Sequence, residues 1–291
     1  MPVVTWDRPM TAALQQLFSC RLQKVLPDLE SETLTWTAGG RPVEMLKLGQ
    51  GSRRVLLTAG HHANETITSL LLWRLLEDYC RGLVENGSLF GFSCRGLFRR
   101  STLYLIPLVN PDGADLTAGA ATAEEVEQAK KLARPDIPFP QGWKANLQGV
   151  DLNLNYPARW ELAREIKEKR PGPRDFPGRA PLDQPETAAL AEYTRQIKPH
   201  IAGAWHTQGA EIYADGDDRL AKMAAHCSGY LWKPVPPESA NAGFRDWFLQ
   251  EFHRPGFTIE AGRGENPLPL SQLPKLYEEN LPIFILLLSG V

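Results

Sequence analysis

The sequence predicts an α/β protein, a single-domain α/β/α sandwich with a central twisted mixed, mostly parallel sheet. Short apolar segments alternate along the chain with longer segments of helical period, which is typical of a sheet covered by helices. Segments such as Val55–Leu57 are continuously apolar, as strands buried on both faces of a parallel sheet must be. Finally, 291 residues without an internal repeat or a linker favour one large domain spanning residues 1–291.

Each element is predicted from its own pattern. Continuous or alternating apolar and β-branched residues predict six strands. These strands are Thr33–Ala38, Val43–Leu48, Arg54–Ala59, Thr102–Val109, His200–Trp205 and Gly256–Ile259. Apolar residues at helical spacing predict eight helices. These helices are Thr11–Val25, Asn64–Leu83, Thr122–Leu132, Ala158–Lys169, Gln184–Ile197, Asp217–Cys227, Gly243–Phe252 and Leu270–Leu288. Two proline-rich stretches between elements, residues 135–140 and 171–181, predict ordered surface loops.

The composition excludes several classes of function. Hydrophobic residues make up 43% of the chain and charged residues 23%, which is the balance of a soluble globular protein. The 32 Lys and Arg residues against 34 Asp and Glu residues give a net charge of -2, so there is no electrostatic basis for binding nucleic acid or an anionic membrane. No apolar stretch approaches the roughly 18 residues that a membrane span requires.

The N-terminal segment and the cysteines together predict a cytoplasmic location. Polar residues interrupt Met10–Phe18, so this segment lacks the continuous apolar core of a secretion signal. The four cysteines are scattered without the spacing of a redox or zinc motif, which predicts reduced thiols rather than a disulfide scaffold.

The residues that follow the predicted strands carry the functional prediction, because ligands collect at the carboxyl ends of strands in open sheets. His62 and Glu65 follow the third strand at a spacing that lets both reach one cation, although the same segment also reads as a helix turn capped by Asn64. His206 follows another strand and is interpreted either as a third metal ligand or as a histidine that is hydrogen-bonded at a strand end. Glu260 follows the last strand and is interpreted as a general base if it faces the metal, and otherwise as a solvated carboxylate.

Six short motifs occur in the order in which they occur in zinc carboxypeptidases. They are Gly60–Glu65, Val109–Gly113, Gly149–Asn153, Pro185–Thr187, His206–Gly209 and the pair Asp246–Trp247 ahead of Glu260. On these residues the chain, from about residue 50 to 270, resembles the M14 zinc carboxypeptidase family of metallopeptidases. The blocks His206–Tyr213 and Phe257–Leu270 are most similar to bacterial γ-D-glutamyl-diamino acid peptidases of cell-wall metabolism.

The resemblance implies one Zn²⁺ ion, a peptide substrate and a role for each matching residue. His62, Glu65 and His206 match the zinc ligands, which leave a fourth position for water. Glu260 matches the general base that takes a proton from the attacking water and passes it to the leaving amine. Asp151 matches the acid that orients the first histidine ligand, and its alternative is a turn-forming residue after a glycine. The segment 110–113 is predicted to be a structural turn near the site.

Three departures from the family pattern concern the substrate. Asn153 can donate a hydrogen bond, but Leu154 stands where the family has an arginine that holds the substrate's terminal carboxylate. Lys144 stands where the family has an oxyanion-stabilising arginine, so it keeps the charge without the bidentate fork, unless it is a solvated surface lysine. The substrate-gating tyrosine of the family aligns near Glu238, and no tyrosine stands there.

Two arginines are candidates for binding a substrate carboxylate. Arg245 matches the base of the family's specificity pocket, where a guanidinium would prefer a carboxylate such as the second one of meso-diaminopimelate. Its alternative is an exposed arginine on a helix surface. Arg263, which follows Glu260, is the second candidate.

Three functional hypotheses follow. The first is a zinc peptidase that hydrolyses the amide between γ-D-glutamate and a diamino acid in peptidoglycan-derived peptides. The second is a zinc-dependent deacylase of N-acyl amino acids, because those enzymes share the Gly-x-His-x-x-Glu pattern of residues 60–65. The third is a catalytically impaired, peptide-binding relative. A substrate panel separates the first two, and any zinc-dependent turnover argues against the third.

Overall fold

The computed structural model describes residues 2–214, 219–237 and 240–290. Eight strands form one sheet in the order β1-β2-β6-β3-β7-β10-β8-β9. Their bounds are β1 Glu30–Trp36, β2 Pro42–Gly49, β3 Arg53–Ala59, β6 Ser101–Ile106, β7 Ile201–His206, β8 Glu211–Tyr213, β9 Leu231–Lys233 and β10 Gly256–Glu260. The four neighbours β6, β3, β7 and β10 are parallel, and antiparallel pairings join β1, β2 and β8 towards the margins. This mixed sheet confirms the predicted fold class.

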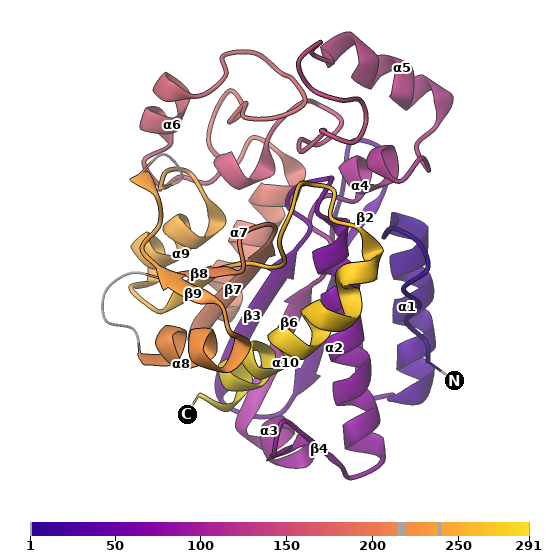
Figure 1. The fold of residues 1–291 in the computed structure, drawn as a ribbon, viewed down its shortest axis with the longest axis vertical. Helices are drawn as coiled ribbons and strands as arrows, with labels where there is room; N and C mark the ends of the chain where they lie inside the picture. Colours follow the sequence, from indigo (N-terminus) through magenta and orange to yellow (C-terminus); the bar gives the residue numbers. More distant parts are fainter. Residues whose placement is uncertain (1, 215–218, 238–239, 291) are drawn as a thin grey trace.

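Helices cover both faces of the sheet (Figure 1). One apolar core packs under α1 Ala12–Val25, α2 Thr66–Val84, α3 Cys94–Arg100, α8 Arg219–Ser228 and α10 Leu273–Ser289. A second apolar core lies on the other face, under α7 Pro185–Ile197 and α9 Phe244–Phe252. The remaining elements are α4 Pro111–Thr117, α5 Ala123–Leu132, α6 Trp160–Ile166, the hairpin of β4 Ser88–Leu89 and β5 Phe92–Ser93, and the 3-10 turns Leu152–Leu154 and Leu270–Gln272.

The predicted elements are present, with shifted ends. The strand predicted over Thr102–Val109 ends at Ile106, and the strand predicted over Thr33–Ala38 runs from Glu30 to Trp36. The helix predicted over Ala158–Lys169 begins only at Trp160, because Arg159 has left-handed backbone angles that a helix does not accept. Residues 217–218 of another predicted helix lie outside the described residues. In the part of the chain that the structure describes, no helix combines the length and apolar character that crossing a bilayer requires.

The segment predicted as a turn over residues 110–113 is instead the start of helix α4, which the side chain of Asn110 caps by accepting a hydrogen bond from Gly113 N. The amide nitrogen of Asn110 also donates to the backbone oxygens of His61 and Ala145, at 3.2 and 3.0 Å. A Cβ atom at Gly113 would lie only 2.6 Å from Ala145 O, so the close approach requires glycine. Asn110 therefore joins the loop that carries His62 to the loop that carries Lys144.

Candidate metal centre and substrate cavity

The register of the parallel strands gathers the predicted residues at one edge of the sheet. Ala59 at the end of β3 pairs with Trp205, and Glu260 at the end of β10 pairs with His206 at the end of β7. A cavity of about 650 Å³ opens at this edge. The predicted site residues that line it are His62, Glu65, Lys144, Asp151, Asn153, His206, Arg245 and Glu260. Helix α2 begins directly after Glu65, so the turn between β3 and α2 carries the first two of them.

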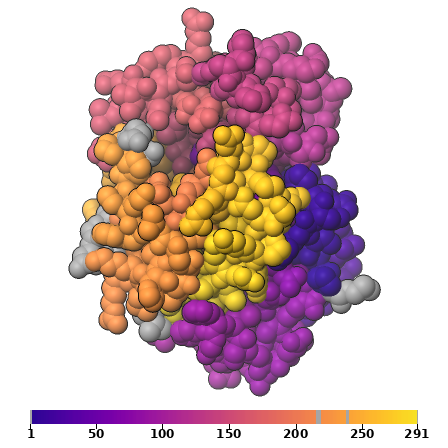
Figure 2. Space-filling model, in the orientation of Figure 1, coloured from indigo at the N-terminus to yellow at the C-terminus, as the bar shows by residue number. Residues whose placement is uncertain are grey.

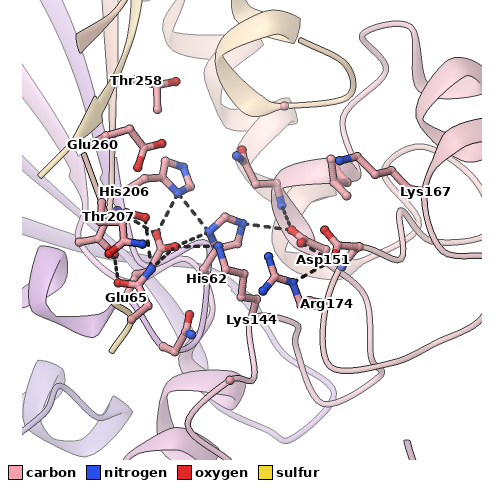
Figure 3. A pocket seen from close by; sticks show the side chains of 18 of the residues that line it. His62, Glu65, Lys144, Asp151, Lys167, Arg174, His206, Thr207, Thr258 and Glu260 are labelled. Atoms are coloured by element: carbon pink, nitrogen blue, oxygen red, sulfur yellow. Dashed lines mark hydrogen bonds and ion pairs between the residues drawn. The ribbon is translucent and has the colours of Figure 1, made fainter. Parts of the chain in front are cut away.

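His62, Glu65 and His206 form a group whose ligand atoms all lie within 4.8 Å of one another (Figure 3). The Nδ1 atoms of His62 and His206 are 3.3 Å apart, and each lies within 3.1 Å of a different oxygen of Glu65. Two ring nitrogens and a buried carboxylate that converge on one point are the donor set that zinc prefers in hydrolytic sites. The residues present therefore fit the zinc ion that the sequence implies.

Electrostatics of this group favours a cation. Burial alone would raise the pKa of the Glu65 carboxyl, but the charges of His62 and Lys144 outweigh it and hold that pKa well below its usual range. Burial likewise opposes protonation of His62, yet the carboxylates of Glu65 and Asp151 raise its pKa to about 9. Burial lowers the pKa of His206. The carboxylates of Glu65 and Asp151 therefore favour positive charge at this point of the cavity.

Asp151 contacts the Nε2 side of the His62 ring. Its Oδ1 atom lies 3.2 Å from His62 Nε2, which leaves Nδ1 facing Glu65 and the cavity. Its Oδ2 atom accepts a hydrogen bond from the backbone N–H of Asp175 at 3.2 Å. Burial disfavours the charged carboxylate, but His62 more than offsets this and lowers the pKa of Asp151. This is the contact that fixes the orientation of a metal-ligating imidazole.

Glu260 and Lys144 face the group from different sides. Glu260 is the strand partner of His206 and lines the cavity beside it (Figure 3). Burial, together with the charge of Glu65, raises the pKa of its carboxyl to about 8. Lys144 Nζ lies 3.2 Å from Glu65 Oε1. Burial opposes its charge, but Glu65 and Asp151 raise the pKa of its ammonium, so Lys144 is a cation inside the cavity rather than on the surface.

Two of the three predicted substrate-binding residues line the cavity, and the third does not. Asn153 lines the cavity and its Oδ1 accepts a hydrogen bond from Phe244 N. Arg245 also lines it but is only 4% exposed, and its Nη1 lies 3.0 Å from Asp246 Oδ1, so the arginine is not an exposed helix residue. The structure does not bring Arg263 into the cavity lining, because Gly262 adopts a positive φ of 78° and turns the chain away after β10. The guanidinium of Arg263 lies 4.0 Å from Glu279 instead.

Sequence reasoning missed several cavity residues. Arg174, Lys167, Tyr213 and Asn266 also line it. Asn266 donates to Glu65 Oε1 at 3.2 Å and so supports the ligand carboxylate. Tyr213 shares a face of the sheet with Thr258 and Glu260 through the pairing of β8 with β10, but β8 has only three residues and the sequence did not predict it. Glu238, where the family tyrosine aligns, lies outside the described residues.

Comparisons with known proteins agree with this geometry. A family model described as zinc carboxypeptidase matches residues 20–226. The chain is 38% identical to gamma-D-glutamyl-L-diamino acid endopeptidase 1 of Lysinibacillus sphaericus, over 91% of this chain and 68% of that protein. Bovine thrombin-activatable fibrinolysis inhibitor has the same fold, with a TM-score of 0.75 at 19% identity over 98% of both chains. Carboxypeptidase A from Helicoverpa armigera superposes with a TM-score of 0.73 at 16% identity, over 98% of this chain and 74% of that one. The protein is therefore a metallopeptidase of the zinc carboxypeptidase family.

Proposed function

We propose that the protein hydrolyses the amide bond between γ-D-glutamate and a diamino acid, meso-diaminopimelate, in peptidoglycan-derived peptides. The observation that carries the proposal is the group of His62, Glu65 and His206 beside Glu260 in one cavity. The name of the 38% identical Lysinibacillus sphaericus relative supports the bond that is cleaved.

Each residue has a definite task in this reaction. A zinc ion held by His62, Glu65 and His206 would polarise the scissile carbonyl and acidify the attacking water. Glu260 accepts a proton from that water and delivers it to the leaving amine. A cation in the ligand group would offset the repulsion from Glu65, which after burial is the second cause of the raised pKa of Glu260.

Lys144 and Asp151 act at two other points. The ammonium of Lys144 lies in the cavity and stabilises the negative charge that develops on the carbonyl oxygen of the scissile amide. Asp151 fixes the ring of His62 through Nε2.

The leaving-group side is lined by Asn153, Leu154 and Arg245. Leu154 cannot bind a terminal carboxylate, which disfavours a general exopeptidase. Arg245 supplies a guanidinium suited to the diamino acid's carboxylate, but Asp246 offsets part of its charge. The electrostatic attraction of Arg245 for a substrate carboxylate is therefore weaker than that of an unpaired arginine.

We further propose one domain and a cytoplasmic location. Strands from both halves of the chain join the same eight-stranded sheet, which supports one folding unit. The thiols of Cys20, Cys80, Cys94 and Cys227 are free, which supports a reducing compartment.

The test is incubation of the zinc-loaded protein with L-alanyl-γ-D-glutamyl-meso-diaminopimelate, with products identified by mass spectrometry. We expect free diaminopimelate, and loss of its release in Glu260→Gln by at least about 1,000-fold with zinc retained. The matched control is Glu161→Gln, an exposed carboxylate on α6 that does not line the cavity, and this variant should stay active. No release from the tripeptide together with hydrolysis of N-acyl amino acids would reject the proposed substrate.

A further inference from the structure

Arg174 has no task in the reaction described so far, yet it lines the cavity beside Lys144 (Figure 3). Its Nε donates to Asp175 Oδ2 at 2.9 Å. Among the described residues, its two terminal amino groups have no hydrogen-bond partner. The side chain is 41% exposed and lines the cavity, so these donors are accessible to a ligand there.

The backbone around Arg174 is fixed on both sides by the catalytic loops. Pro173 O accepts hydrogen bonds from Lys144 N and Ala145 N at 2.8 and 3.0 Å. Asp175 N donates to Asp151 Oδ2, the same carboxylate that orients His62. Arg174 therefore projects from a segment that is placed relative to both the metal group and Lys144.

Arg174 and Lys144 line the same cavity, and Figure 3 shows the two side chains next to each other. Two neighbouring cations with free donors form a site for an anionic group of a ligand. Arginine presents paired N–H donors that match a carboxylate.

A γ-glutamyl substrate provides such a group at the right place. The γ-linkage uses the side-chain carboxyl in the scissile amide and leaves the α-carboxylate free. Four C–C bonds separate that carboxylate from the scissile carbonyl carbon, a reach of about 5 Å. The carboxylate therefore lies on the acyl side, one side-chain length from the carbonyl that Lys144 faces.

We infer that Arg174 binds the free α-carboxylate of the γ-D-glutamyl residue and so selects substrates with this group over those in which it is amidated. The inference rests on the proposed function and adds the residue that recognises the acyl part of the substrate. It involves no bond-making step, because Arg174 acts only through ionic hydrogen bonds to the substrate.

The experiment compares kcat/KM for L-alanyl-γ-D-glutamyl-meso-diaminopimelate and for the same peptide with the α-carboxyl as carboxamide. The measured quantity is the ratio of the two values. We expect Arg174→Gln to lower this ratio by roughly 10-fold or more, and Arg174→Lys to lower it less, since lysine keeps the charge without the fork. Arg170→Gln is the matched control, because Arg170 is exposed on the same loop and does not line the cavity.

The possible outcomes separate the two levels of the proposal. An equal loss of kcat/KM for both peptides in Arg174→Gln would show a structural role and overturn the inference. A wild-type ratio near one would also overturn it while leaving the proposed function in place. If the wild-type protein cleaves neither peptide, the proposed function itself fails, and the inference fails with it.

Discussion

The two walls of the cavity are built in different ways. One wall, the ligand wall, carries His62, Glu65, His206 and Glu260 and lies at the ends of three parallel strands. The pairing of β3, β7 and β10 sets the positions of His206 and Glu260 directly. The opposite wall, with Lys144, Asp151 and Arg174, comes from residues 133–184, where the regular structure is limited to short helical turns. Side chains such as Asn110 and Asn146 hold that wall by hydrogen bonds to backbone groups. Sheet register therefore places the residues of the metal group, whereas a polar network places the residues that we propose to contact the substrate.

The largest expected effect comes from breaking the ligand wall. His206→Ala removes one nitrogen donor from a group of three, so the metal should dissociate on dialysis and turnover should fall below detection. Zinc content by mass spectrometry of the dialysed protein measures the first effect. His226→Ala is the control, because His226 is exposed on α8 and should keep its zinc. Full zinc retention in His206→Ala would contradict the ligand assignment.

A smaller effect is expected in the opposite wall. Lys144→Met keeps the length of the side chain and removes the charge, so kcat should fall about 100-fold while zinc content is unchanged. Lys144→Arg restores a cation with a bidentate fork and should recover most of the activity. Steady-state kinetics of the two variants checks this pair. Equal activity of Lys144→Met and the wild type would show that another group stabilises the oxyanion.

The smallest effect concerns stability rather than turnover, and it tests how the opposite wall is held. Glu186 in α7 is fully buried and accepts a hydrogen bond from Asn146. Burial raises the pKa of its carboxyl from 4.5 to about 7. Its contribution to stability is therefore full below about pH 4.5 and is lost as the pH rises through about 7. The loss corresponds to about 3 kcal/mol of unfolding free energy.

Glu186→Gln cannot ionise and should remove this pH dependence. Urea unfolding of both proteins between pH 5 and 8, without activity as a readout, gives the difference directly. The wild type should lose stability relative to the variant as the pH rises. A constant difference across this range would mean that Glu186 is already ionised in the folded protein.

The sequence predicted the sheet and the ligand wall because both depend on patterns that the chain itself displays. Continuous apolar strands ending in His206 and Glu260 place those side chains at one edge without any knowledge of the loops. The sequence did not predict strands β8 and β9 or helix α4. The two strands have three residues each and the helix has seven, and segments this short carry no periodic signal.

The opposite wall was less predictable because proximity in sequence and proximity in space differ there. Arg174 has no motif of its own. Its position depends on its neighbours, because Pro173 O accepts hydrogen bonds from the backbone of residues 144 and 145, and Asp175 N donates one to Asp151. Arg263 was predicted from its closeness to Glu260 along the chain, but the turn at Gly262 directs it elsewhere. Long-range backbone contacts of this kind leave no trace in local composition.

The anchoring of Arg174 by its neighbours' backbone has a consequence for the adaptability of the enzyme. Pro173 O and Asp175 N hold the segment, and neither contact uses the side chain at position 174. A different side chain at 174 would thus meet the acyl part of the substrate from the same position, without rebuilding the loops around His62. Acceptance of new acyl groups can be altered at a single codon while the hydrolytic machinery is inherited unchanged.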